Sequence, residues 1–364
     1  MDHSNSPQAH SLKKNAIGLG LLVFLVISAA APLTGIAGAI PIAMLLGNGA
    51  GIPGTFILMS VILAIWALGF VALARRIRNA GAFYAYSARA LGGRFWGAIA
   101  LIAVLAYNAM MVGLLGLLGG AAAGVFGQFG VNLPWWVWSL IATVLIGILG
   151  YKEAELSAKV LMVLVALEVL IGLVVAFAIL FKGGAGDLTY NILDPGLIFV
   201  GGGTVAAILF TFGSFIGIEA TAIYAEEVRD ADRTVPKATF VAIFLIGLFY
   251  SFTTWTMVVG TGVDVLVPAI AALPDPTFYL FSLAERYAGG TVAMVLGLLL
   301  VSSVFASAQA MHNFIARYFY VTGREGLLPG FMGITHATHQ SPHVGSIVQT
   351  VLAVIVVIFF AAMG

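Results

Sequence analysis

The longest uncharged stretch of this chain constrains its fold more than any other feature. Between Lys14 and Arg75 there is no Asp, Glu, Lys or Arg, and residues 47–53 interrupt the stretch with glycines and a proline. A helix needs about 20 apolar residues to cross a bilayer, so the stretch is long enough for two crossings. Strands of membrane barrels alternate in polarity instead of being continuously apolar. We therefore predict an all-α integral membrane protein.

The composition supports this prediction and argues against several other classes. Hydrophobic side chains make up 61% of the 364 residues and charged ones 9%, whereas soluble domains carry about a quarter charged residues. The net charge of +1 argues against a nucleic-acid partner, which needs a clustered basic face. The lack of cysteine excludes disulfides, thiolate nucleophiles and iron–sulfur clusters. We expect the lipid bilayer as a partner, no nucleic acid and no cofactor.

The same reasoning divides the rest of the chain into seven further spans, which makes nine helices in all. These seven are predicted at residues 95–124, 134–150, 160–181, 197–225, 238–260, 290–316 and 344–363. A cytoplasmic amino terminus, with residues 1–14 as a polar tail, leaves only Lys182 and Arg286 of the sixteen Lys and Arg outside. The positive-inside rule therefore predicts this orientation in the cell membrane. Gly364 then follows an apolar run directly, so we expect the native chain to continue into a tenth helix.

Two spans carry signs of an interrupted helix. Pro32, Gly35 and Gly38 lie near the middle of the first span, and residues 212–217 of the sixth span follow three consecutive glycines. Five spans separate the two interruptions, which is the spacing of an inverted repeat, and paired broken helices indicate a transporter site. We expect residues 15–181 to form one five-helix repeat, 182–196 an extracellular loop and 197–364 an incomplete second repeat. Glycine-rich faces for close helix packing are the alternative.

The chemistry of a broken helix predicts the kind of substrate. Free amides at the start of one half-helix attract anions, and free carbonyls at the end of the other attract cations. An amino acid satisfies both ends, and a small amine chiefly the second. Aromatic and polar neighbours either close over the substrate or simply pack the helices. The candidate substrate-binding residues are Pro32, Leu33, Thr34, Gly35, Tyr107, Asn108, Phe212, Gly213, Ser214, Phe215 and Gly217.

Four residues inside the spans are candidates for ion or proton coupling. Glu168 and Glu219 lie in apolar helices, where an ionised carboxylate costs about 2.5 to 3.5 kcal/mol or more, so such groups usually serve a function. Glu168 is the stronger candidate for a proton carrier, with a neutral structural carboxyl as the alternative. Glu219 is close enough to the loop to reach the interface instead. Ser303 and Ser307 lie one turn apart and would suit sodium coupling, although such serines usually bond their own helix.

Four stretches of the sequence resemble one known family in the correct order. They are AGAFYAY with the following LG at 80–92, SFIGIE at 214–219, EEVRDADRTVPKA at 226–238, and the segment from Arg317 to Pro329. These stretches are similar to the amino acid-polyamine-organocation (APC) permeases. The resemblance implies a LeuT-like fold of two inverted five-helix repeats, usually followed by two more helices. It also implies secondary active transport of amino acids or related small amines, as proton-coupled symport or exchange.

Two departures from the family pattern concern the site itself. The first span carries Pro32-Leu33-Thr34-Gly35 where many relatives have a Gly-Ser-Gly turn that binds a substrate carboxylate. Glu168 stands where some proton-coupled relatives carry a lysine. At the position of Glu168 a titratable group is therefore kept, with the opposite charge. Because the Gly-Ser-Gly turn is replaced, the resemblance specifies the substrate less closely.

Two other functions compete with transport. A membrane-embedded metal-dependent enzyme rests on the spacing of His336, His339 and His343, but Pro342 interrupts any helix that would present all three. His312 is isolated in the eighth span, so a second histidine cluster is missing and we expect no metal site. A passive channel is the other alternative, and the sequence has no selectivity-filter repeat.

Overall fold

The computed structural model describes residues 12–77, 79–92, 95–152, 154–185, 188 and 190–363. Throughout these ranges the regular structure is helical, apart from a single β-bridge between Ile17 and Val228. Most of the expected polar tail, residues 1–11, lies outside the described ranges. The first helix begins at Leu19 and not directly after the tail. The longer helices of the protein are α1 (Leu19–Ala30), α4 (Ile52–Arg76), α6 (Trp96–Gly127), α7 (Trp135–Tyr151), α8 (Ala154–Phe181), α10 (Gly202–Gly213), α12 (Ala231–Thr261), α15 (Gly290–Arg324) and α16 (His343–Met363).

Short helices continue or connect these long ones. The first helix goes on through α2 (Pro32–Thr34), the π-helical turn η1 (Gly35–Ala39) and α3 (Ile40–Leu46), while η2 (Gly49–Gly51) leads into α4. The remaining short elements are α5 (Phe83–Leu91), α9 (Pro195–Ile198), α11 (Ala220–Ile223), α13 (Leu266–Ala271), η3 (Pro276–Phe278), α14 (Tyr279–Ala288) and η4 (Gly330–Gly333).

The helices match the predicted spans in type, and the differences are in length. Seven helical segments of the described chain are long and apolar enough to cross a membrane, counting Leu19–Leu46 as one. The spans expected at 134–150 and 197–225 correspond to the shorter helices α7 and α10. The helix of the eighth span extends beyond residue 316, to Arg324. Apolar patterns miss such an extension because it carries Arg317 and Arg324, which pair with Glu227 and Glu226.

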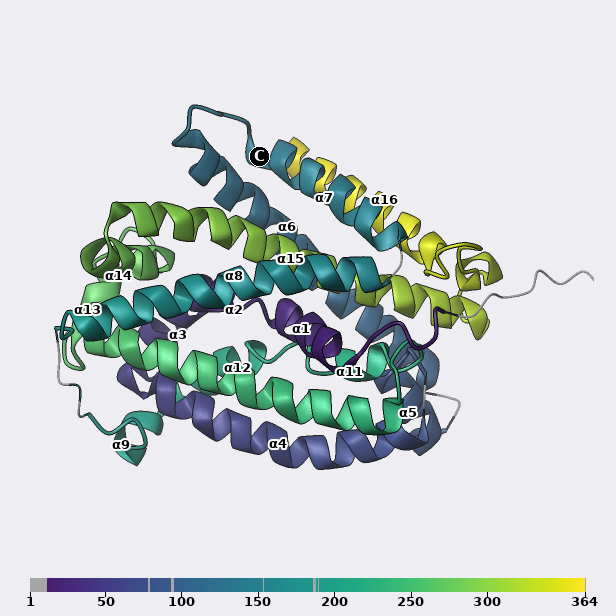
Figure 1. Cartoon of the computed structure of the whole chain (residues 1–364), viewed down its shortest axis with the longest axis horizontal. Coiled ribbons are helices and arrows are strands. Elements are labelled where there is room, and N and C mark those ends of the chain that lie inside the picture. The colour runs from purple at the N-terminus through teal and green to yellow at the C-terminus, as the bar shows by residue number, and fades with distance from the viewer. Residues whose placement is uncertain are drawn as a thin grey trace, which may run out of the picture.

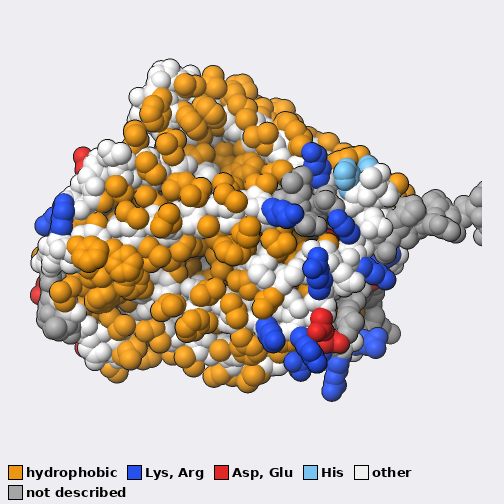
Figure 2. Space-filling model, in the orientation of Figure 1, with side chains coloured by type: hydrophobic (Ala, Val, Ile, Leu, Met, Phe, Trp, Pro, Cys, Tyr) orange, Lys and Arg blue, Asp and Glu red, His pale blue; other side chains and the backbone are white. Residues whose placement is uncertain are grey.

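The first helix lies at the centre of the molecule. Figure 1 shows α1 surrounded by the long helices, and it packs against α8, α12 and α15. Its sequence is apolar on all sides, as expected for a helix buried in the core of a bundle. On the outside, α4 packs along α12, while α7 and α16 lie side by side. Figure 2 shows the result as a largely hydrophobic face, with most of the Lys and Arg side chains visible in this view gathered at one end.

Both predicted helix interruptions coincide with breaks in the structure. The first break is at Ala31, whose left-handed backbone (φ 46°) separates α1 from the half-helix that starts at Pro32. The second break lies in the sixth segment, which is the part of the sixth span from α10 to α11 (residues 202–223). There α10 ends at Gly213, and turns replace the helix from Ser214 until α11 starts at Ala220. The sequence placed the sixth span over residues 197–225 as one segment, but its continuous helix covers only the first half.

At the positively charged end of the molecule, Glu227 contacts both the N-terminal residues and α15. The backbone N–H groups of Ala16 and Ile17 both donate to the Glu227 carbonyl, at 2.9 and 3.1 Å. The Glu227 side chain accepts a hydrogen bond from Arg317 Nε at 2.7 Å, and both side chains are buried. The Arg317 guanidinium also lies 4.2 Å from the centre of the Tyr224 ring. The sequence analysis placed Arg317 on the cytoplasmic side of the membrane, and the structure adds that its side chain is enclosed by these partners.

We expect Arg317→Met to destabilise the protein, because it leaves the Glu227 carboxylate buried without its cation. Removing one partner of a buried ion pair costs about 3 to 5 kcal/mol. Adding Glu227→Gln should restore part of the stability, since no uncompensated charge is then buried. Thermal unfolding of the detergent-solubilised single and double variants measures this coupling. An Arg317→Met protein that unfolds at the parent temperature would show that the pair does not stabilise the fold.

Candidate functional site

The first helix break is held by polar side chains from two other helices. The Thr34 backbone N–H donates to Ser303 Oγ of α15 at 3.1 Å, and the Thr34 hydroxyl lies 2.9 Å from the same atom. Ser303 Oγ in turn donates to Glu168 Oε2 of α8 at 2.7 Å. The backbone N–H of Leu33 also interacts with this carboxyl group. The amides that the break leaves free are therefore directed, directly or through Ser303, at Glu168, which is 0% exposed.

The carbonyl side of the same break is held by hydroxyl groups. Ser307 Oγ of α15 donates to the Ala29 carbonyl at 3.1 Å, and the Tyr250 hydroxyl of α12 donates to the Ala30 carbonyl at 3.1 Å. Position 35, which lies against Tyr250, requires glycine, because a Cβ atom there would collide with the Tyr250 ring. Ser303 and Ser307 are thus one turn apart but serve opposite ends of the break.

Glu219 has the corresponding place in the sixth segment. Its Oε2 accepts a hydrogen bond from the Gly217 backbone N–H at 2.9 Å, and its Oε1 accepts one from the Tyr107 hydroxyl of α6 at 2.7 Å. The side chain is 7% exposed, so it does not extend to the interface as one interpretation of the sequence proposed. The carboxylate instead joins the broken segment to α6.

The two breaks contact each other. Gly217 has a left-handed backbone (φ 110°), and a Cβ atom there would collide with the Ala29 side chain and lie 3.1 Å from the Val26 carbonyl. The unwound part of the sixth segment therefore lies against the last turn of α1. Only a residue without a side chain permits this close approach.

Four predicted site residues are hydrogen-bonded to their own helix, packed against an aromatic side chain, or exposed. The Asn108 side chain donates to the Val104 carbonyl of its own helix at 2.8 Å. Ser214 does the same with the Phe210 carbonyl at 3.1 Å. Phe215 is buried beside Phe56, with ring centroids 6.2 Å apart. Phe212 is 52% exposed.

The remaining candidates lie at the breaks. Pro32 and Leu33 are buried in the first turn of the half-helix. A Cβ atom at Gly213 would have nothing within 4 Å, so this last residue of α10 borders open space.

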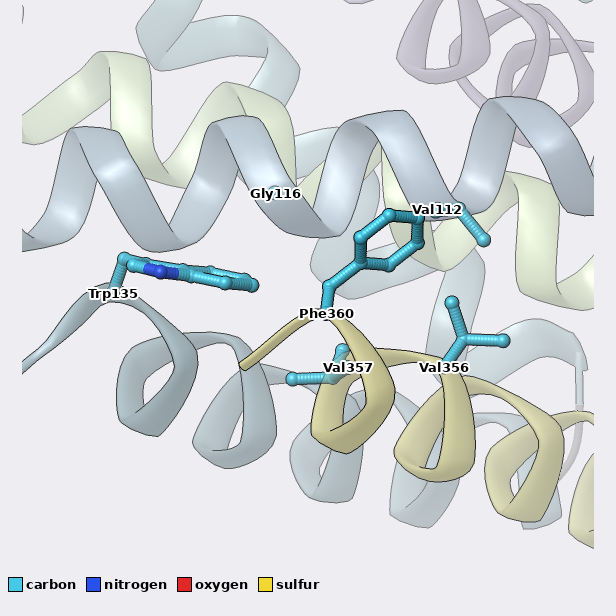
Figure 3. A pocket seen from close by; sticks show the side chains of 6 residues that line it. All are labelled: Val112, Gly116, Trp135, Val356, Val357 and Phe360. Carbon is cyan, nitrogen blue, oxygen red and sulfur yellow. The ribbon is translucent and has the colours of Figure 1, made fainter. Parts of the chain in front are cut away.

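Three cavities are either apolar or lie at the charged end of the molecule. A cavity of about 290 Å³ between α6, α7 and α16 is lined by Val112, Gly116, Trp135, Val356, Val357 and Phe360 (Figure 3). A second, of about 610 Å³, runs between α4 and α12, and its Ser60 and Ser251 hydroxyls bond backbone carbonyls. A third, of about 660 Å³, is polar and lies at the charged end beside Lys14 and Glu226.

The three loop histidines are not arranged as a metal site in the part of the chain that the structure describes. The rings of His336, His339 and His343 gather around Tyr151, but no group of three His, Cys, Asp or Glu within the described ranges is arranged to hold a metal ion. The Nδ1 atom of His336 accepts backbone N–H groups from Thr338 and His339, as a loop-stabilising side chain does.

Tyr250 is the site residue that the sequence analysis missed. It follows a run of apolar residues in α12 and is indistinguishable there from a packing aromatic side chain. The available signal was its hydroxyl group, because a buried tyrosine usually needs a hydrogen-bond partner. The partner itself, a carbonyl in another helix, is apparent only from the fold.

Comparison with known proteins now identifies the family. Residues 23–363 match the model of the family described as amino acid permease. The chain belongs to the amino acid permease family. This family consists of membrane permeases of the APC superfamily, which argues against the metal-dependent enzyme as an alternative.

Two characterised relatives illustrate the range of the family. The chain is 29% identical over 334 residues to the histidine permease HisP of Lactococcus lactis subsp. cremoris (strain MG1363), covering 84% of this chain and 65% of that protein. It is 24% identical over 325 residues to the low-affinity putrescine importer PlaP of Escherichia coli (strain K12), covering 86% and 68%. The chain thus spans about two thirds of the length of these relatives.

Solved structures share the fold. MhsT in complex with L-phenylalanine superposes with a TM-score of 0.59 at 16% identity, covering 95% of this chain and 80% of that one. The substrate-bound outward-open state of a Na⁺-coupled sialic acid symporter gives 0.62 at 15% identity, covering 94% and 74%. At these identities the likeness concerns the fold alone.

Two glycines of the sixth segment should respond differently to alanine. Gly217→Ala forces a side chain into a left-handed backbone, at a cost of about 1 to 2 kcal/mol, and into contact with Ala29. Gly213→Ala should leave stability unchanged or slightly raised, because its Cβ atom enters open space and alanine favours helix. The apparent melting temperatures of the two purified variants test this contrast. Equal melting temperatures would show that the breaks are not in close contact.

Proposed function

We propose that this protein is a secondary active transporter that moves amino acids or related small amines by alternating access. The observation that carries the proposal is the pairing of two broken helices in the core, each with a buried carboxyl group at its break. Such paired breaks offer oriented backbone dipoles at the depth where a transporter binds its substrate. The histidine permease and the putrescine importer among the relatives support the substrate class.

The proposed architecture is an inverted repeat. We assign residues 15–181 to the first five-helix unit, 182–196 to the connecting loop and 197–364 to the second unit. The breaks fall in the first segment of each unit, which supports the assignment. Substrate would then be reached from alternate sides as one unit moves against the other.

The proposed orientation has the amino terminus in the cytoplasm. Lys and Arg gather at the end of the molecule where α4 and α15 terminate with Arg75, Arg76 and Arg324 (Figure 2). Positively charged loops favour the cytoplasmic side of a cell membrane.

Glu168 is our proposed proton carrier. Its carboxyl group joins α8, α15 and the first break, so a change in its charge acts directly on the elements that must move. Neutralisation would weaken its hydrogen bonds with Ser303 and the half-helix, because bonds to an ionised acceptor are the stronger ones. We favour a proton over sodium because Ser303 Oγ already accepts the Thr34 backbone N–H and lies 2.9 Å from the Thr34 hydroxyl, which leaves this oxygen little capacity to bind a cation.

We expect Glu168→Gln to abolish accumulation driven by a proton gradient while substrate counterflow survives. Glutamine keeps the shape and an acceptor oxygen for Ser303 but cannot bind and release a proton. The measurement is uptake of a radiolabelled substrate into proteoliposomes, with and without an imposed pH gradient, beside the exposed-residue control Asp264→Asn. Accumulation by Glu168→Gln equal to that of the parent would assign Glu168 a structural role. Transport by the parent that only equilibrates the substrate would indicate a passive channel instead.

A further inference from the structure

The end of the first half-helix is already occupied by a carboxyl group of the protein. Thr34 directs both its backbone N–H and its hydroxyl at Ser303, and Ser303 donates to Glu168. Since Ser303 has one hydroxyl hydrogen, which it gives to Glu168, the Thr34 hydroxyl is the donor in the bond between them. In this series of hydrogen bonds the donors of Thr34 and Ser303 therefore all point toward Glu168. This arrangement suits an ionised carboxylate.

A substrate carboxylate would need these same backbone groups. Pro32 has no N–H group, Leu33 and Thr34 are directed at Glu168 and Ser303, and Gly35 donates to the Ala31 carbonyl at 2.9 Å. The first turn of the half-helix thus presents no free amide to a second anion. A carboxylate brought to this point would also face the charge of Glu168, and like charges in a poorly solvated site repel strongly.

The sixth segment is closed to an anion in the same way. The amide of Gly217 is bound by Glu219, and the amides of Phe215 and Ile216 donate to the carbonyls of Phe212 and Gly213. The donors to both carboxyl groups are neutral: hydroxyls of Ser303 and Tyr107, and backbone N–H groups. Two buried carboxyl groups with neutral donors favour a cation at the site, because burying an uncompensated negative charge is costly.

The Glu168 carboxyl group also has capacity left for a cation. Its Oε1 atom is buried and has no hydrogen-bond partner within the described part of the chain. The backbone carbonyls of the break add negative partial charge beside it, since within the described residues Ala29 and Ala30 each accept one hydroxyl from another helix. A carbonyl has two lone pairs, so these groups can accept a further donor.

We propose that the Glu168 carboxylate takes the place of a substrate carboxylate at the first helix break, so that the protein selects small organic amines that carry no α-carboxylate. Glu168 is in this view the specificity-determining residue. The inference rests on the proposed transport function and narrows its substrate class. It concerns equilibrium selectivity and is independent of which ion drives transport.

The test compares ligands that differ only at the α-carboxylate. Histamine, histidine methyl ester and histidine form one series, and 1,4-diaminobutane with ornithine forms a second. Binding to the purified full chain in lipid nanodiscs is measured by titration calorimetry and by the ligand-dependent rise in melting temperature. We expect each amine to bind at least about tenfold more tightly than its amino acid, a difference of about 1.4 kcal/mol. The ester should bind more tightly than histidine, because its charge is masked.

Variants of Glu168 test whether this residue causes the selectivity. Glu168→Ala frees the half-helix amides, and Glu168→Gln keeps the side-chain shape but removes the charge. Both should lower the ratio of amine to amino acid affinity toward one, while the exposed-residue control Asp264→Asn keeps the parent ratio. If Glu168→Ala does not fold, the ratio for Glu168→Gln decides the question.

Three outcomes would overturn the inference. Histidine and ornithine binding the parent protein as tightly as their amines would show that Glu168 does not replace a substrate carboxylate, while leaving the proposed transport function intact. A methyl ester that binds as weakly as histidine would show that size and not charge is rejected. If no ligand of either series binds or is transported, the proposed function fails together with the inference.

Discussion

Every backbone N–H and C=O group in the core of a membrane protein must find a partner within the protein, because lipid supplies none. A continuous helix meets this requirement by itself, and a broken helix does not. In this protein the groups released around Ala31 are satisfied by side chains of α8, α12 and α15, and the Gly217 amide after the second break is satisfied by Glu219. Two of those side chains are carboxyl groups, which are expensive to bury and strong acceptors once buried. The geometry of the site therefore depends on where Glu168 and Glu219 lie.

In the proposed transport cycle, the two carboxyl groups connect parts of the molecule that must separate. Glu168 reaches from α8 to the first break through Ser303 of α15, and Glu219 reaches from the sixth segment to Tyr107 of α6. A change in the charge of either group alters bonds to more than one helix at once. The proposed proton coupling and the proposed substrate selectivity at Glu168 are consequently compatible, since both depend on the charge that this side chain carries at the break.

The sequence was informative about the site where a residue was unusual in its surroundings. Glu168 and Glu219 stood out as acidic residues in apolar helices, and Pro32 with its neighbouring glycines stood out in the first span. Thr34, Ser303 and Ser307 were also selected, but not as partners of Glu168. Tyr250 was not selected, and Asn108 was selected although it bonds only its own helix. Aromatic and polar residues are common in helices of this kind, so identity alone does not separate a site residue from a packing residue.

The sequence by itself determined the class of the protein, the approximate position of its helices and the location of both helix breaks. These properties depend on the local order of apolar residues, glycines and proline, which one segment specifies without reference to another. Only the tertiary structure decided that the Glu168 carboxyl group meets the amide end of the first break and that Gly217 lies against Ala29. Those contacts join residues far apart in the chain, and their distances depend on how the helices pack. The physical reason is that the hydrophobicity of each helix is sufficient for its insertion into the membrane. The partner of a backbone group freed by a break depends instead on how the helices pack against one another.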